Sequence, residues 1–193
     1  MSRLFQRVNW ALDPGTCFWW ALLLLCLPVQ WLLAALAAAF IHEAGHTMAV
    51  CLCKGKVISL RIGISGAALR TACMSPGKEI LCSLAGPFAS ILCLLLIPVC
   101  PMVALCGFFQ GIYNLLPVYP LDGGRVLLGI LRILCRKDPD GVFLKVQTAF
   151  SLLLFLVAVY VGIRFEIGLL SIFPALVFLF RKIPCKDGKH RLQ

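Results

Sequence analysis

Charged residues are scarce in this chain. Only 13% of its 193 residues are Asp, Glu, Lys or Arg, and only 8 residues are acidic. A soluble domain of this size needs many more polar residues to cover its surface, so the composition excludes that class of protein. Apolar residues make up 61% of the chain instead, and its mean hydropathy is +0.97. The composition predicts an all-α, polytopic membrane protein embedded in the lipid bilayer.

A disulfide framework and a cleavable signal peptide are also missing. The 11 cysteines are odd in number and irregularly spaced, and most lie in apolar runs, where Cys behaves as a small buried hydrophobe. Polar and turn-forming residues follow directly after the basic N-terminal residues, which does not fit a signal peptide. The net charge of +10 comes from residues that flank apolar segments. We therefore expect contact with anionic lipid and no binding of nucleic acid.

Runs of apolar residues predict about six transmembrane segments in one membrane-embedded domain, residues 1–193. The predicted segments are 17–29, 31–53, 79–98, 102–116, 146–163 and 167–180. Between the second and third, apolar and polar residues alternate from Ile58 to Ser65, which predicts a small β-ribbon at the membrane interface. This ribbon is either a plain hairpin or an edge to which an extended substrate segment adds as a strand.

The basic residues predict the orientation of these segments. If both termini face the cytoplasm, Lys and Arg number 2 in the N-terminal tail, 5 from Lys54 to Lys78, 5 from Arg125 to Lys145 and 5 after Phe180. Only Arg164 then lies on the other side. Positive charge is retained on the cytoplasmic side, so we expect a multi-pass protein of the cell membrane in this orientation.

A His-Glu-x-x-His motif occupies residues 42–46, inside the second apolar segment. On a helix, His42 and His46 project from one face, one turn apart, at a spacing that lets two imidazoles bind a single Zn²⁺. Glu43 then lies beside the metal, where a carboxylate can act as general base toward a water molecule. Ionisable groups in hydrocarbon are costly unless they serve a site. The motif therefore predicts one zinc ion per chain, on the cytoplasmic side of the bilayer.

A catalytic zinc usually has three protein ligands, so two histidines require a third residue. Among the remaining acidic residues, Asp122 alone lies at a break in apolar sequence, where two prolines and two glycines fall within residues 117–124. Irregular backbone at membrane depth is tolerated only where it is buried in protein or lines a cavity. We expect Asp122 to be the third ligand. The amide of Asn114, shortly before this break, can donate to a carbonyl of the substrate.

Three motifs together resemble the site-2 protease family (M50) of intramembrane zinc metalloproteases. They are His-Glu-x-x-His at 42–46, Ala-Gly-Pro at 85–87 and Asn-x-x-Pro-x-x-Pro-Leu-Asp-Gly-Gly-Arg at 114–125. Within the family the chain is most similar to the compact bacterial stage IV sporulation FB type. The CBS domain of many such relatives, and the PDZ domain of others, have no counterpart in residues 1–193.

The resemblance implies a role for each candidate residue. His42, His46 and Asp122 would be metal ligands, Glu43 the catalytic base and Asn114 a substrate-binding residue. The implied activity is cleavage of membrane-bound or membrane-associated proteins within or near a transmembrane segment, as in regulated intramembrane proteolysis. The implied partners are the bilayer and a membrane-tethered protein substrate, while no oligomeric state follows from the motifs.

Two other classes of membrane protein are alternatives to a protease. In a metal-ion transporter, the His and Asp side chains would line a permeation path, but the chain has one cluster with an interposed Glu and no sign of inverted repeats. In a non-catalytic scaffold, bound zinc would only hold helices together.

Overall fold

The computed structural model describes residues 9–12, 28–55, 57–63, 66–71, 75–135 and 137–164. This part of the chain is mostly helical, and the chain divides into two compact units, Met1–Leu116 and Pro117–Gln193. The predicted sixth membrane segment, 167–180, lies outside the described residues, as does all of the first, 17–29, except its last two residues.

Three of the described helices are long and apolar enough to cross a membrane. They are α2 (Val29–Leu52), α3 (Pro76–Leu92) together with the 3₁₀ helix η1 (Cys93–Leu96) that continues it, and α6 (Pro139–Arg164). At 1.5 Å per residue, α2 is about 36 Å long, which exceeds the roughly 30 Å of a hydrocarbon core. These helices coincide with the second, third and fifth predicted segments and fit a multi-pass membrane protein.

Helix α4 (Pro101–Asn114) coincides with the fourth predicted segment, 102–116, but has only 14 residues. Its length of about 21 Å is less than the thickness of a hydrocarbon core. A membrane crossing by α4, and the total of six crossings, therefore stay predictions.

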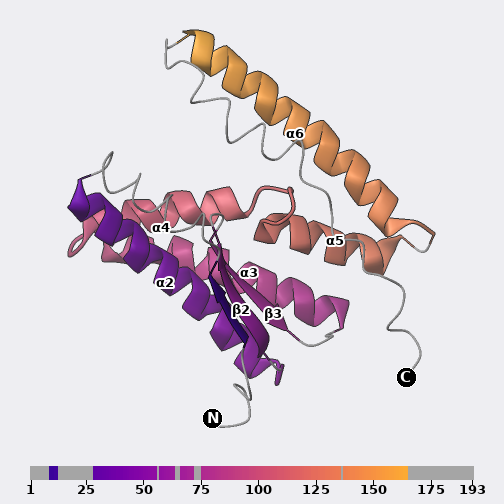
Figure 1. Cartoon of the computed structure of the whole chain (residues 1–193), viewed down its shortest axis with the longest axis horizontal. Coiled ribbons are helices and arrows are strands. Elements are labelled where there is room, and N and C mark those ends of the chain that lie inside the picture. Colours follow the sequence, from indigo (N-terminus) through magenta and orange to yellow (C-terminus); the bar gives the residue numbers. More distant parts are fainter. Residues whose placement is uncertain are drawn as a thin grey trace. The chain divides into compact units, whose positions relative to one another are not determined.

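In the first unit, α2, α3 and α4 pack against one another (Figure 1). The face of α2 that is buried by this packing carries small residues and the two histidines at four-residue intervals: Ala34, Ala38, His42, His46 and Val50. The exposed positions of α2 carry large apolar side chains, including Leu33, Phe40, Met48 and Leu52. Large apolar groups on the outside and small or polar groups on the inside suit a helix surrounded by lipid.

Small residues bring the backbones of these helices close together. A Cβ atom added at Gly45 of α2 would lie 2.7 Å from both the Ala85 carbonyl oxygen and the Ala89 Cβ on α3. One added at Gly107 of α4 would lie 2.7 Å from the Cβ of Cys93, the first residue of η1. Any larger side chain at either glycine would force the helices apart, so these contacts determine the spacing of the bundle.

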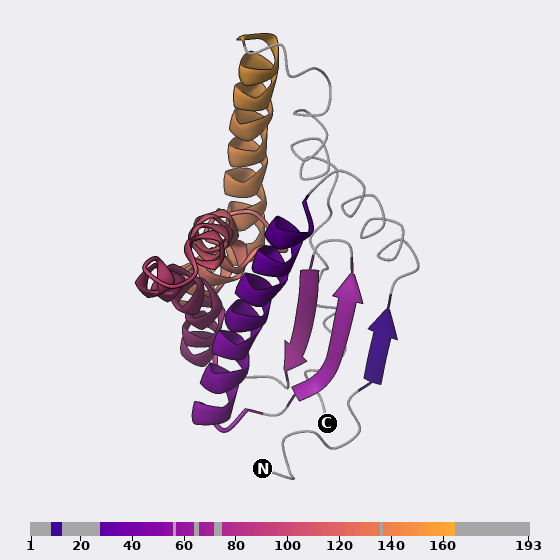
Figure 2. The ribbon, with the colours of Figure 1, turned by 90° about the vertical axis from the view of Figure 1, so that its left-hand side faces the viewer.

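A three-stranded sheet, in the order β1-β2-β3, belongs to the same unit. Its strands are β1 (Asn9–Leu12), β2 (Val57–Gly63) and β3 (Gly66–Thr71). Figure 2 shows β1 parallel to β2 and β2 antiparallel to β3. The β2–β3 pair occupies the segment for which a ribbon was predicted, whereas β1 was not predicted, and the position of the ribbon at a membrane interface stays a prediction.

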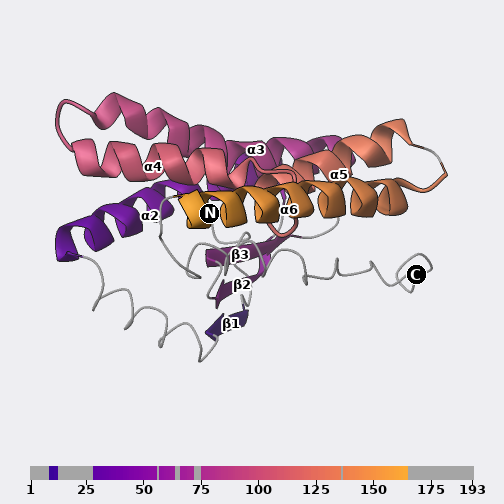
Figure 3. The ribbon, with the colours of Figure 1, turned by 90° about the horizontal axis from the view of Figure 1, so that it is seen from above.

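The second unit contains α5 (Asp122–Leu134) and α6, which form a helical hairpin (Figure 3). An ion pair of 3.1 Å joins Arg132 of α5 to Asp140 in the first turn of α6. No helix was predicted between Arg125 and Lys145. The Asp-Gly-Gly start and the two arginines of α5 interrupt its apolar pattern, and its 13 residues are too few to cross a membrane, so a search for long apolar runs does not reveal it.

Candidate metal centre

His42 and His46 lie side by side on the buried face of α2. Their Nε2 atoms are 3.1 Å apart, and the ring centroids are 4.8 Å apart at an interplanar angle of 83°. Only 3% of His42 and 9% of His46 is exposed. The four-residue spacing therefore brings two imidazole nitrogens to one point inside the helix bundle.

This nitrogen pair fits one zinc ion. Zinc–nitrogen bonds are about 2.0–2.1 Å long, so two nitrogen ligands of a tetrahedral zinc stand about 3.3 Å apart. The observed 3.1 Å is close to that separation. Glu43, the next residue after His42, is half-buried, and its backbone carbonyl accepts a hydrogen bond of 2.9 Å from Thr47 Oγ1.

Helix α3 contacts the outer nitrogen of both rings. His46 Nδ1 lies 2.8 Å from the carbonyl oxygen of Cys82, and His42 Nδ1 lies 2.8 Å from Ser90 Oγ. Sequence reasoning missed both partners because they are 36 and 48 residues from the histidines along the chain. Only the Ala-Gly-Pro sequence at 85–87 hints that α3 lies close to another helix.

Gly86 of α3 lies directly against the His46 ring. A Cβ atom added at this position would overlap Nε2 and Cε1 of the ring and would lie 2.8 Å from its Cδ2. Because Gly86 has no side chain, the ring fits between the backbones of the two helices.

Asp122 is the first residue of α5 and thus belongs to the second unit. It is 6% exposed, and its Oδ1 lies 3.9 Å from Nη1 of Arg125. A carboxylate at a helix N-terminus is stabilised by the unpaired N–H groups there. Its role as third ligand stays a prediction.

The backbone just before Asp122 is held by residues of the same unit. The Leu121 N–H donates to the Val118 carbonyl at 2.9 Å, and the Tyr119 N–H donates to Oε1 of Gln147 on α6 at 3.0 Å. A Cβ atom at Gly124 would lie 2.6 Å from the Val118 carbonyl carbon, so only glycine lets this loop fold back over the start of α5.

Asn114 is the last residue of α4 and is half-buried. Its Nδ2 donates to the Gln110 carbonyl at 3.1 Å, a bond that uses one of the two amide hydrogens. Substrate binding by Asn114 stays a prediction.

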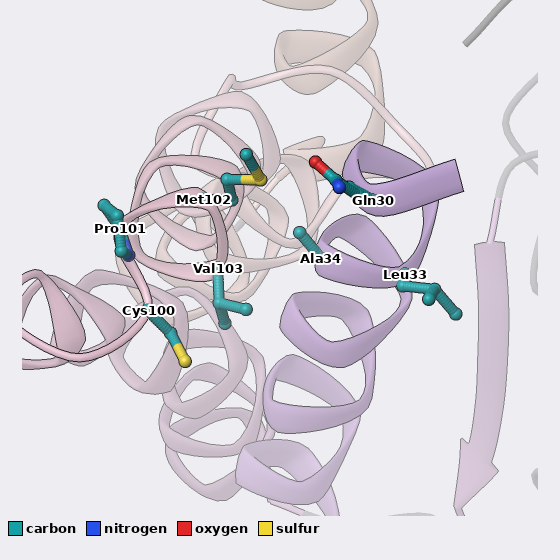
Figure 4. Close-up of a pocket in the computed structure, with 7 residues that line it drawn as sticks. All are labelled: Gln30, Leu33, Ala34, Cys100, Pro101, Met102 and Val103. Atoms are coloured by element: carbon teal, nitrogen blue, oxygen red, sulfur yellow. The ribbon is translucent and has the colours of Figure 1, made fainter. Parts of the chain in front are cut away.

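A groove of 360 Å³ lies between the start of α2 and the start of α4 (Figure 4). Its lining residues are mostly apolar: Gln30, Leu33, Ala34, Cys100, Pro101, Met102 and Val103. Ala34 precedes His42 by about 12 Å along the helix axis. The groove is therefore a separate feature from the histidine pair.

Comparison with known proteins gives one family match and one similar solved structure. Residues 95–159 match the model of peptidase family M50, whereas no curated protein matches the chain. The solved structure of the Site-2 Protease from Methanocaldococcus jannaschii is similar, with a TM-score of 0.67 and 18% sequence identity over 94% of this chain and 95% of that one. The structural likeness shows a shared fold, and the family match adds the class of chemistry. The family match over residues 95–159 and the shared fold thus support a metalloprotease of peptidase family M50.

Proposed function

We propose that the chain is an intramembrane zinc endopeptidase, which cleaves membrane-bound or membrane-associated proteins within or near a transmembrane segment. The observation that carries this proposal is the pair of buried imidazoles, 3.1 Å apart, on a helix long enough to span a membrane. Ionisable groups are rare in such helices unless they serve a function. The family match favours peptide hydrolysis over the other uses of a buried metal.

His42, His46 and Asp122 are the proposed ligands of one zinc ion. Support for Asp122 comes from its burial and from the bonds that hold the backbone before it, since metal ligands need such outer contacts to keep their orientation. When bound, zinc would polarise the scissile carbonyl and lower the pKa of a water molecule toward 7.

Glu43 is the proposed general base. It accepts a proton from the attacking water and later donates it to the leaving amine. The amide of Asn114 is proposed to hold the substrate backbone. A helical peptide bond has its carbonyl hydrogen-bonded within the helix, so the substrate must unwind locally, and residues that weaken helices near the cleavage site should speed the reaction.

The site is proposed to open toward the cytoplasm, with both termini on that side. The distribution of basic residues supports this orientation. His46 precedes the end of α2 at Leu52 by six residues, or about 9 Å, which keeps the site within reach of water from that side. Six membrane crossings with the ribbon at the interface complete the proposed topology.

The test uses the full-length protein purified in detergent and fluorescent single-span peptides that differ in central helix-breaking residues. Zinc content and cleavage are measured for wild type, Glu43→Gln and the control Glu79→Gln, which alters a half-buried glutamate in the first turn of α3. Glu43→Gln should keep zinc but cleave about 10²–10⁴-fold more slowly, because only the base is lost. Undiminished cleavage by Glu43→Gln would refute the mechanism. Zinc flux into proteoliposomes without cleavage would favour a transporter, and bound zinc with neither activity would favour a scaffold.

A further inference from the structure

The two imidazoles receive their outer contacts from the same helix, α3, in opposite order along the chain. His42 contacts Ser90, and His46, one turn later in α2, contacts Cys82, two turns earlier in α3. This order is that of antiparallel helices. Helix α3 thus acts as a template against which both rings are aligned.

The two contacts differ in chemistry. The Cys82 carbonyl can only accept, so His46 must carry its proton on Nδ1, which leaves the Nε2 lone pair for a metal. The Ser90 hydroxyl can donate or accept, and so it is compatible with either tautomer of His42. A metal bound at Nε2 of His42 requires the proton on Nδ1, and in that tautomer Ser90 Oγ is the acceptor.

Ser90 is enclosed between α2, α3 and α4. Its side chain is 0% exposed. It also packs near α4, because a Cβ atom added at Gly111 would lie 3.2 Å from the Ser90 Cβ. A buried serine in a helix often only bonds back to the carbonyl one turn earlier. Here its oxygen lies at hydrogen-bond distance, 2.8 Å, from a buried ring nitrogen.

We propose that Ser90 is a positioning residue of the metal centre: its hydroxyl oxygen accepts a hydrogen bond from Nδ1–H of His42 and thereby directs Nε2 toward the metal. This inference rests on the proposed function, in which His42 and His46 bind zinc. Outer partners of histidine ligands raise ligand basicity and fix ring orientation, and their removal typically weakens metal binding 10- to 100-fold.

The inference is tested with the full-length protein in detergent, by competition for zinc with a chromophoric chelator. Ser90→Ala should bind zinc about 10- to 100-fold more weakly than wild type. The matched control is Ser83→Ala, which removes another buried hydroxyl from the same helix and should keep the wild-type affinity. If Ser90→Ala fails to fold, Ser90→Cys preserves the volume but supplies only a weak acceptor, and it should also lower the affinity.

Two further measurements separate positioning from a merely structural role. The absorption spectrum of the cobalt-substituted protein should change in Ser90→Ala but not in Ser83→Ala, because the orientation of a ligand differs. Equal zinc affinities and equal cobalt spectra for wild type and Ser90→Ala would overturn the inference, even if the variant unfolded at a lower temperature. A wild-type protein that binds no zinc would instead refute the proposed function on which the inference rests.

Discussion

Replacement of Gly86 by alanine tests the close contact between α3 and the His46 ring. The added Cβ would lie 2.8 Å from Cδ2 of the ring and would overlap Nε2 and Cε1. Carbon atoms in contact are normally about 3.5–4.0 Å apart, so the ring must retreat by about 0.7 Å or more. Distances in a metal site tolerate only about 0.2 Å of error. The required displacement is several times larger.

Two measurable losses follow for Gly86→Ala. Zinc affinity should fall at least about 100-fold, because a ligand is displaced and not merely left without its outer partner. Overpacking should also lower the free energy of unfolding by about 1–3 kcal/mol, although alanine is the better helix former by about 1 kcal/mol. Chelator competition measures the first quantity, and unfolding of the purified protein in mixed detergent micelles measures the second.

Gly77→Ala is the matched control on the same helix. No atom lies within 4 Å of a Cβ added at Gly77, so this variant should keep its zinc affinity and be as stable as wild type or slightly more stable. If Gly86→Ala bound zinc as tightly as Gly77→Ala, the placement of the His46 ring against α3 would be wrong.

Three further substitutions and one control probe the second unit. Asp122→Asn should weaken zinc binding at least about 10-fold in chelator competition, since an anionic ligand becomes neutral, and an unchanged affinity would contradict its role as third ligand. Gln147→Leu deletes the acceptor of the Tyr119 N–H, so it should lower the cleavage rate and reduce the free energy of unfolding by about 1–3 kcal/mol. Wild-type values for both quantities would show that this hydrogen bond does not hold the loop. Phe143→Ala removes a ring that is 0% exposed and should lower the free energy of unfolding by about 3–5 kcal/mol. The control Leu153→Ala, at a side chain that is 53% exposed, should change this free energy by less than about 0.5 kcal/mol. Equal losses of stability in the two variants would contradict the observed burial.

The sequence predicts the parts of this structure that depend on local pattern. The four-residue spacing of His42 and His46 is enough to bring their nitrogens together, because helix geometry alone places them on one face. Long apolar runs likewise predict α2, α3 and α6, since a helix satisfies its backbone hydrogen bonds within a single segment in hydrocarbon.

The missed features depend on contacts between distant residues. Strand β1 pairs with β2 across about fifty residues of chain, with Asn9 opposite Ser59, and a four-residue strand has too weak a local signal to reveal such a partner. Nothing local distinguishes Ser90 from any other serine in an apolar helix. Its proposed role depends on the antiparallel packing of α2 and α3. Small residues such as Gly45 permit this packing, but they do not identify which residues of the two helices come into contact.

The dependence of both imidazoles on α3 has a consequence for biosynthesis. Helix α2 leaves the ribosome first, and His46 and His42 meet their partners on α3 only after 36 and 48 further residues have been synthesised. Helices that enter a bilayer one by one associate afterwards, so the two rings reach lipid before their hydrogen-bond acceptors are in place. Metal loading is therefore expected to follow the insertion of α3 and the synthesis of the proposed third ligand, Asp122, and a nascent chain arrested before Pro76 should carry the complete His-Glu-x-x-His motif and yet retain no zinc.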